Sequence, residues 1–263
     1  MDTLSLNSLF SRESIRETLF PQGCTLCGNS LLNNPSDYPL NSPDYYYGLC
    51  FNCRKKLAIP LAGRGRCSLC GQPLISEQGT CLPCRNGSAR SFDRLISLFP
   101  YMGKFKKILG EFKFKRRLSL GNFFVEKLWQ GLDLMFSSEH DSDIVWVPVP
   151  ARPGKIKHNG WDQIEYLSKL LEISIRYRLK NSESFIPLQR CLKRLPSVSQ
   201  KQLNKENRFQ NLKGRIITDT GNIPKKAILF DDVYTTGATM DSCAAALKSG
   251  GTEKVYGLCL CYD

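Results

Sequence analysis

The sequence has few features of a membrane or secreted protein. No apolar run approaches the roughly 20 residues that a membrane-spanning helix requires, and the longest strand-like run covers only residues 144–149. The first twenty residues mix charged side chains with Leu and Phe, without the continuous apolar stretch of a signal peptide. At 41% hydrophobic and 23% charged residues, the composition is that of a globular protein, not of a disordered or collagenous one. We therefore expect a cytoplasmic protein that is not an integral membrane protein.

Histidine is scarce, and the common nucleotide-binding loops are missing. The two histidines, His140 and His158, lie among charged residues, and we expect both at the surface and not in catalysis. The sequence contains neither a Walker A loop nor a G-x-G-x-x-G turn. Acidic residues are outnumbered by basic ones, 24 to 37, which gives a net charge of +13. This surplus favours an anionic partner such as a nucleic acid, a phosphorylated metabolite or an anionic membrane face.

Cysteine is abundant and unevenly placed. Eight of the twelve cysteines form four C-x-x-C pairs before residue 85, and the other four are expected as small core or surface residues. Two such pairs complete a tetrahedral zinc site, so four pairs predict two closed, structural sites. Disulfides and redox-active pairs are the alternatives, and a reducing compartment disfavours disulfides. We expect neighbouring pairs to share a metal, with an interleaved cross-brace as the other possibility. The predicted zinc ligands are Cys24, Cys27, Cys50, Cys53, Cys67, Cys70, Cys81 and Cys84.

The cysteine-rich region repeats itself. The eight residues that begin at Cys24 resemble the eight that begin at Cys67, and a second C-x-x-C pair follows each copy. Residues 21–90 contain too few apolar side chains to build a core unaided, so something other than a hydrophobic core must hold them together. We predict a short amphipathic helix over residues 1–20, a double C-x-x-C zinc-binding module over 21–90, and a further domain over 91–263.

The last part of the chain alternates between strand and helix patterns. Apolar runs predict strands over residues 92–101, 144–149, 227–230 and 255–260. Helical periodicity predicts helices near residues 105–112, 124–135, 164–171 and 239–247. Residues 191–214 lack periodicity and are expected to form a long loop, of the kind that is usually functional. The alternation predicts an α/β fold with a mostly parallel sheet.

A pair of acidic residues and a small-residue loop form the most informative segment. Asp231 and Asp232 end the apolar strand of residues 227–230, at the sheet edge where α/β proteins bind ligands. Residues 235–239 follow at the start of a helix, where backbone N–H groups and hydroxyls suit a phosphate. Carboxylates beside this loop suit ribose hydroxyls or Mg²⁺. Together they predict a site for a phosphorylated ribose; the alternative is a simple helix cap beside solvated aspartates.

This segment resembles the 5-phosphoribosyl-1-pyrophosphate (PRPP) motif of type I phosphoribosyltransferases, and nearly the whole chain resembles the ComF family (competence proteins, ComFC/GntX-like). The resemblance includes the C-x-x-C module, residues 112–114, the strand end at 147–150, and the Arg208-x-x-Asn211 spacing. It also includes residues 159–163, Asn-Gly-Trp-Asp-Gln, where the family usually has Arg-Gly-Phe-Asn-Gln.

The resemblance implies a phosphoribosyltransferase-like parallel sheet with helices on both faces and a site for PRPP with Mg²⁺. It implies that Asp231 and Asp232 bind the ribose hydroxyls and that Arg152 contacts the diphosphate. Residues 191–211 would form a flexible loop over the site, with Arg190, Lys193 and Arg194 near its start. The predicted 5′-phosphate loop consists of Thr235, Thr236, Gly237, Ala238 and Thr239.

The residues do not identify an acceptor for the ribose. Enzymes of this fold that act on 6-oxopurines have an Asp at the position of Thr235, and a Thr cannot move a base proton near neutral pH. The catalytic residues therefore stay unknown, and PRPP binding is better supported than transfer. Trp161 is expected to be a packing residue.

A basic stretch lies at residues 104–117, with three phenylalanines among its cations. Cations with aromatic platforms suit single-stranded nucleic acid; the alternative is a solvated helix face that draws PRPP inward. The family resemblance implies handling of imported single-stranded DNA in natural transformation, with DNA-uptake or recombination proteins as partners, in the cytoplasm or at the inner face of the membrane. A Mg²⁺-dependent phosphoribosyltransferase of nucleotide metabolism without a DNA role is the other possibility. The candidate nucleic-acid contacts are Lys104, Lys106, Lys107, Lys113, Lys115, Arg116 and Arg117.

Overall fold

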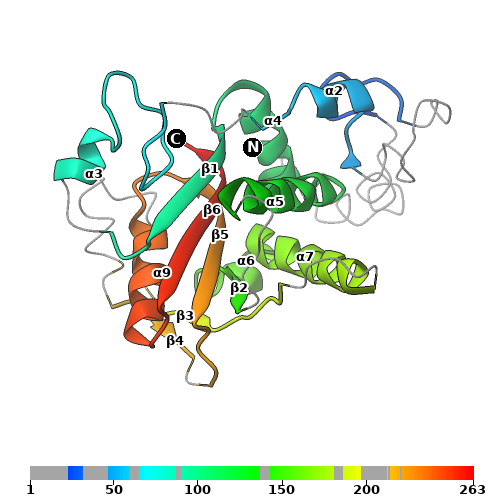
Figure 1. Ribbon diagram of the computed structural model, residues 1–263. Coiled ribbons are helices and arrows are strands. Elements are labelled where there is room, and N and C mark those ends of the chain that lie inside the picture. The colour runs from blue at the N-terminus through cyan, green and yellow to red at the C-terminus, as the bar shows by residue number, and fades with distance from the viewer. Residues whose placement is uncertain are drawn as a thin grey trace, which may run out of the picture. The chain divides into compact units, whose positions relative to one another are not determined.

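The computed structural model describes residues 23–31, 47–59, 65–86, 90–136, 143–180, 186–196, 212, 214–219 and 221–263 (Figure 1). The helix expected in residues 1–20 lies outside these ranges. The chain groups into two compact units: unit 1 contains Met1–Ile59 and Met102–Glu126, and unit 2 contains Pro60–Tyr101 and Lys127–Asp263. The two cysteine groups thus fall in different units. The domain boundaries expected at residues 20/21 and 90/91 stay predictions.

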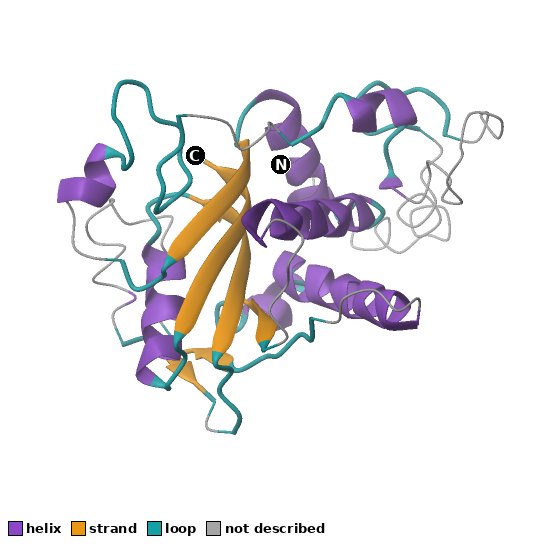
Figure 2. Cartoon of the chain, viewed as in Figure 1, coloured by secondary structure: helices purple, strands orange, loops and turns teal. Residues whose placement is uncertain are grey.

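Unit 2 is built on a parallel sheet, as the alternating pattern predicted. Its strand order is β1-β6-β5-β2, and every neighbouring pair is parallel (Figure 2). The strands are β1 (Arg94–Pro100), β2 (Ile144–Pro148), β5 (Lys226–Tyr234) and β6 (Lys254–Tyr262). Their side chains are mostly buried, because helices cover both faces of a parallel sheet.

Two contacts show that helices α5 (Leu120–Phe136) and α9 (Ala238–Ser249) cover opposite faces of the sheet. A Cβ atom at Gly131 of α5 would lie 2.8 Å from Leu258 Cδ1. A Cβ atom at Gly257, the preceding residue of β6, would lie 3.0 Å from Met240 Cε of α9. Since successive strand residues point to opposite faces, α5 and α9 sandwich β6.

The connections that follow β2 and β5 run toward opposite edges of the sheet. From β2 the chain passes through α6 (Lys155–Asn159) and α7 (Gln163–Lys180) to Leu188, which bridges Trp146 in parallel on the outer side of β2. Helix α7 packs on α5, since Trp129 Nε1 donates a hydrogen bond to Ser174 Oγ at 3.0 Å. From β5 the chain passes in the other direction, through α9, to β6. The switch point of the sheet therefore lies between β2 and β5, where open α/β sheets bind their ligands.

Two sequence expectations need correction. The stretch expected as a loop over residues 191–214 contains strand β3 (Leu192–Arg194), which pairs with β4 (Ile216–Thr218) in an antiparallel hairpin. Three residues are too few to leave a periodic signal, so only the pairing reveals this strand. Strand β5 also continues beyond the expected end at Phe230 to Tyr234, because β6 still pairs with it there.

Unit 1 has its own small core. It contains α2 (Phe51–Lys55), α4 (Gly103–Lys115) and the first turns of α5. The rings of Phe112 and Phe124 pack with centroids 5.2 Å apart, and Leu49, Ile108 and Leu109 are fully buried. The apolar stripe predicted for α4 is confirmed, except that Phe105 is only half-buried. Among the described residues, none of the helices is long and apolar enough to span a membrane.

Candidate functional site

The duplicated cysteine segments fold in the same way. In each copy the N–H of the first cysteine donates to the carbonyl five residues later, at 2.8 Å for both Cys24 and Cys67. Each turn then reaches a glycine with positive φ, +78° at Gly28 and +68° at Gly71, a conformation that favours glycine. A short helix carries the last cysteine of each group: α2 in the first copy and α3 (Leu82–Asn86) in the second. The internal repeat read from the sequence is therefore a structural repeat.

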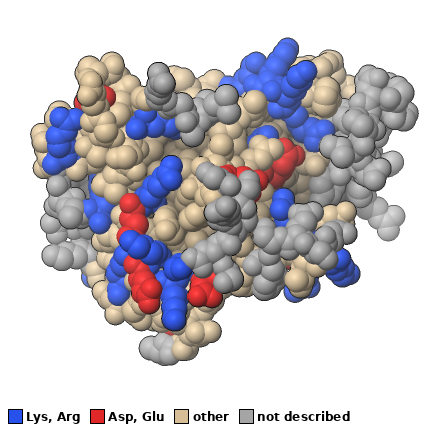
Figure 3. Space-filling view, in the orientation of Figure 1, with Lys and Arg blue, Asp and Glu red and all other residues tan. Residues whose placement is uncertain are grey.

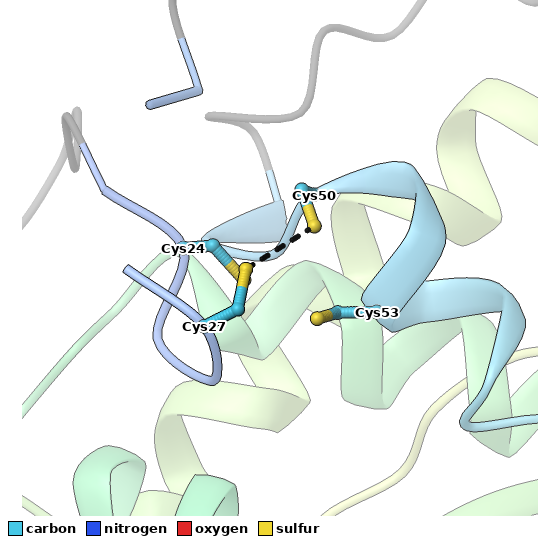
Figure 4. A group of neighbouring side chains, drawn as sticks. All are labelled: Cys24, Cys27, Cys50 and Cys53. Atoms are coloured by element: carbon cyan, nitrogen blue, oxygen red, sulfur yellow. Dashed lines mark hydrogen bonds between the residues drawn. The ribbon is translucent and has the colours of Figure 1, made fainter. Parts of the chain in front are cut away.

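The eight cysteines gather into two groups of four, in sequential pairing. The first cysteine cluster is Cys24, Cys27, Cys50 and Cys53, and the second cysteine cluster is Cys67, Cys70, Cys81 and Cys84. Figure 4 shows the four side chains of the first cluster pointing toward one another. The pairing that the spacing favoured is confirmed, and the cross-brace is wrong.

The sulfur positions suit tetrahedral zinc. All four Sγ atoms of each cluster lie within 4.8 Å of one another, with a distance of 3.7 Å between Cys27 and Cys50 and of 3.6 Å between Cys70 and Cys81. A tetrahedral ion with zinc–sulfur bonds of about 2.3 Å requires sulfurs about 3.8 Å apart. A zinc ion bound here would lock two loops together, and four thiolates would leave it no open position for a substrate.

Backbone donors favour the thiolate form of the first cysteine in each cluster. Burial raises the pKa of Cys24, but hydrogen bonds from the N–H groups of Cys27, Cys50 and Leu26 outweigh burial and lower the pKa to about 7. The same balance, with N–H groups of the corresponding knuckle, lowers the pKa of Cys67 to about 7. Because metal binds the thiolate, these donors prepare each cluster for zinc.

The two predicted aspartates lie at the switch point of the sheet. Strand β2 pairs with β5 only up to Phe230, so Asp231 and Asp232 extend past its end while β6 still supports them. Asp232 is 5% exposed, and Asp231 is half-buried and accepts a hydrogen bond from the Asp232 N–H at 2.8 Å. Two carboxylates thus stand at the carboxyl end of the sheet, where they suit hydroxyl donors or a hard cation.

The small-residue loop, residues 235–239, connects β5 to α9. Gly237 caps the helix with a φ of +82°, and the Ala238 N–H donates to Thr236 Oγ1 at 3.3 Å. We call these residues the phosphate loop, because the N–H groups at the start of α9 form the anion-binding end of a helix.

A polar network beside Asp232 was not anticipated. Gln163 Nε2 donates to Asp232 Oδ2 at 2.5 Å, and Lys155 Nζ lies 2.5 Å from both Gln163 Oε1 and Asp162 Oδ2. Asp162 is 5% exposed and caps α7, accepting from the N–H groups of Ile164 and Glu165. Residues 159–163 could have suggested this, since Asp replaces the family's Asn and both residues cap helices. Beside this network the ring of Trp161 packs on Tyr166, with centroids 5.9 Å apart.

Arg194 interacts electrostatically with both Asp231 and Arg152. Arg152 follows β2 and is exposed, and Arg194 lies half-buried on β3. Burial chiefly lowers the pKa of Arg194; Cys243 raises it, Arg152 lowers it and Asp231 raises it. Arg190 instead is held on α7 by Glu172 at 2.5 Å and Glu165 at 3.1 Å. The β3–β4 hairpin therefore directs Arg194, and not Arg190, toward the aspartates.

The basic residues of 104–117 lie on and after α4. In Figure 3 a dense group of Lys and Arg side chains lies over this helix. Lys107 Nζ donates to the Leu26 carbonyl of the first cysteine knuckle at 3.2 Å. Lys115 and Arg117 both pair with Glu111, at 2.7 and 3.2 Å. Exposed side chains on this surface are Lys104, Lys106, Lys107, Phe114, Lys115 and Arg116, and Lys113 and Arg117 are half-buried.

Of the remaining sequence predictions, His158 is exposed, as expected. Cys191, Cys243, Cys259 and Cys261 are all buried. His140 and all of residues 197–211 lie outside the described residues.

Sequence comparison supports the resemblance. No protein-family model matches the chain. It is 28% identical to the competence protein ComFC of Bacillus subtilis over 77% of its own length and 79% of that protein. It is 25% identical to competence protein F of Haemophilus influenzae, over 80% of its length and 90% of that protein. It is also 25% identical to the DNA utilization protein YhgH of Salmonella typhimurium, over 81% of its length and 96% of that protein. The chain is thus similar, over most of its length, to competence proteins and DNA utilization proteins.

Proposed function

We propose that this protein binds PRPP with Mg²⁺ at the end of β5 and acts on imported single-stranded DNA during DNA uptake. The observation that carries the PRPP part is the placement of Asp231, Asp232 and the phosphate loop at the switch point of a parallel sheet. Two carboxylates for a ribose therefore stand next to helix N–H groups for its 5′-phosphate. Arg152 and Arg194 supply positive charge for the diphosphate.

The reaction class follows from the chemistry of such a ligand. Mg²⁺, for which carboxylate and diphosphate oxygens are preferred ligands, would neutralise the diphosphate and assist its departure from the ribose. The chain's own residues would orient the ribose through Asp232 and hold the diphosphate through the two arginines. Thr235 offers no group to accept a proton from a nucleobase, so we assign binding of PRPP and leave the acceptor open.

The PRPP assignment is tested by calorimetry on the full-length protein. We expect Mg²⁺-dependent PRPP binding that Asp231→Asn with Asp232→Asn abolishes, because the variant loses both negative charges. The control is Asp219→Asn, which changes a carboxylate on the β4 side of unit 2. Unchanged PRPP binding in the double variant would overturn the assignment.

The DNA part of the proposal rests on unit 1 and on the relatives' names. The segments 47–59 and 102–126 contain ten basic and two acidic residues. Of the three phenylalanines on α4, Phe112 is buried, Phe105 is half-buried, and Phe114 is 70% exposed. An exposed aromatic ring among cations is the combination that single-stranded DNA uses for stacking and backbone contact. Two relatives named above are competence proteins and one is a DNA utilization protein.

The DNA assignment is tested with Phe114→Ala and with Lys104→Glu plus Lys106→Glu. Loss of one stacked base costs about 1–3 kcal/mol, so Phe114→Ala should weaken oligonucleotide binding about 5-fold or more. The charge reversal should make the slope of log affinity against log salt concentration shallower by at least about 0.7 for each phosphate contact that is lost. Tyr177→Ala is a matched control, because that ring on α7 is 69% exposed. Equal effects of both aromatic substitutions would contradict the assignment to α4.

A metabolic transferase without a DNA role is the second candidate, because the PRPP site does not require the basic face. Pyrophosphate release from PRPP with a defined nucleobase, together with unaltered activity after charge reversal on α4, would favour it.

A further inference from the structure

Tyr234 packs against the phosphate loop and belongs to the buried core that includes the second cysteine cluster. It ends β5, is 3% exposed, and belongs to the same buried core as Cys67, Cys70 and Cys81. A Cβ atom at Gly237 would lie 2.6 Å from Tyr234 Oη and 2.9 Å from Cζ, so the tyrosine ring packs directly beneath the loop. Burial chiefly raises the pKa of Tyr234; Arg90 lowers it, and the Cys70 and Cys84 thiols raise it, so the hydroxyl interacts electrostatically with these groups.

A second connection joins the same cysteine knuckle to the start of α9. The N–H of Leu95 on β1 donates to the Leu69 carbonyl at 2.7 Å, and a Cβ atom at Gly71 would lie 2.7 Å from the Leu95 carbonyl oxygen. The Leu95 side chain reaches across the sheet to Gly257, where Met240 Cε of the first turn of α9 also packs. The knuckle of the second cluster is thereby fixed to β1, and β1 packs against α9, the helix that follows the phosphate loop.

A third connection comes from the chain just after the second cluster. The Ser91 N–H donates to Asp241 Oδ1 at 2.7 Å, and Asp241 lies in the first turn of α9. Three separate contacts therefore tie the second cluster and its flanks to the segment that presents the loop's N–H groups. The first cysteine cluster belongs to unit 1, so it provides an internal control in the same molecule.

We propose that Tyr234 is a positioning residue that supports the phosphate loop from the core around the second cysteine cluster. Metal binding at this cluster and PRPP binding at the loop then strengthen each other. The inference rests on the proposed PRPP function and adds a coupling to it. A phosphate is held by several N–H groups only while their directions are fixed, and release of the metal would free the cluster that fixes them. Coupling between two sites is reciprocal, so bound PRPP must then retain the metal.

The test uses the wild-type, zinc-loaded, full-length chain and does not depend on catalysis. The protein is exposed to a zinc-selective chelator and a thiol-alkylating reagent with or without Mg²⁺-PRPP, and mass spectrometry follows alkylation of each cysteine. We expect PRPP to slow modification of Cys67, Cys70, Cys81 and Cys84 at least about fivefold, the lower end of usual coupling. Modification of Cys24, Cys27, Cys50 and Cys53 should change less than twofold.

Calorimetry on the same sample separates the two ways in which this can fail. If PRPP does not bind, the proposed function is overturned and the coupling falls with it. If PRPP binds but both clusters react at unchanged rates, or both are protected equally, only the coupling is overturned.

Two variants then test the role of the tyrosine ring. Tyr234→Phe keeps the ring under Gly237 and should retain both PRPP affinity and the selective protection. Tyr234→Ala should reduce the protection to less than twofold and weaken PRPP binding at least fivefold. Full protection of the second cluster in Tyr234→Ala would show that the coupling does not pass through this residue. If the alanine variant does not fold, the wild-type alkylation result still decides the coupling.

Discussion

Gln163 offers a sharp test of the site, because it bridges Asp232 and Lys155. Its amide nitrogen donates to the Asp232 carboxylate and its oxygen faces the Lys155 ammonium, both at 2.5 Å. We consider two substitutions. Gln163→Leu removes both contacts, whereas Gln163→Glu keeps an oxygen for Lys155 but places a second carboxylate against Asp232.

The magnitude follows from the kind of bond that is lost. A hydrogen bond to a charged group contributes about 1.5–3 kcal/mol, and each 1.4 kcal/mol is about tenfold in affinity. Since Asp232 is 5% exposed, little water can replace the lost donor. Gln163→Leu should therefore weaken PRPP binding roughly 10- to 100-fold.

Gln163→Glu gives a result that a merely structural change would not give. Two adjacent carboxylates raise the pKa of one of them. Above that raised pKa both are charged and repel, and PRPP affinity should fall at least as far as in Gln163→Leu. As pH falls, the new carboxyl group takes a proton and again donates to Asp232, so the ratio of variant to wild-type affinity should rise.

Isothermal titration with Mg²⁺-PRPP at several pH values measures this ratio directly. Gln78→Leu is the control, because Gln78 is exposed in the second cysteine module. Wild-type affinity of Gln163→Glu at pH 8, with no change on acidification, would refute the claim that Gln163 orients Asp232.

Three further predictions concern stability and metal content. Gly131→Ala should destabilise unit 2 by about 1–3 kcal/mol through overpacking, since the added Cβ would lie 2.8 Å from Leu258 Cδ1. Gly110→Ala is the control: its Cβ would have no neighbour within 4 Å, so the substitution should stabilise α4 by about 1 kcal/mol. Urea titration measures the free energy of unfolding of both variants, and equal changes would contradict the packing of α5 on the sheet. Burial raises the pKa of Asp93, but hydrogen bonds from Lys248, at 2.8 Å, and from neighbouring donors lower it overall, below its ordinary 3.8. The Asp93 carboxylate therefore contributes fully to the free energy of unfolding above pH 3.8, and this contribution is lost as pH falls further. Asp93→Asn should lack this part of the pH dependence in acid unfolding. Identical acid unfolding curves for the variant and the wild type would contradict the role of Asp93. Elemental analysis should find two zinc ions per chain, and a content well below two would contradict the zinc assignment. Removal of the zinc by a chelator should lower the thermal unfolding temperature, because the metal binds only the folded arrangement of the two clusters.

Much of the fold follows from local patterns in the sequence. The apolar runs at residues 144–149 and 227–230 correctly predicted two strands, and the stripe of Ile108, Leu109 and Phe112 predicted a helix, because burial imposes its period on the chain. The C-x-x-C spacing with the internal repeat predicted both four-cysteine groups and their sequential pairing. Strand β3 was missed, because a three-residue strand on an antiparallel hairpin leaves no periodic signal.

The candidate site could be predicted only in part from the sequence. Asp231, Asp232 and the phosphate loop are contiguous, so one segment of sequence contains them all. The contacts of Gln163 with Asp232 and of Tyr234 with Gly237 depend on how β5 lies between its neighbours, and neither leaves a pattern in the chain. The different exposure of Phe112 and Phe114 was predictable, because only Phe112 lies on the apolar stripe of the helix.

The sequence by itself determined the two four-cysteine groups, the parallel α/β fold and the segment that presents two carboxylates and a helix start, because each depends on spacing along a short stretch. Only the tertiary structure decided that the two cysteine clusters belong to different units and that the second one packs with the core beneath the phosphate loop. It also decided which arginine approaches Asp231. These features join residues far apart in the chain, and their contacts are fixed by strand order and side-chain packing, which local patterns do not specify.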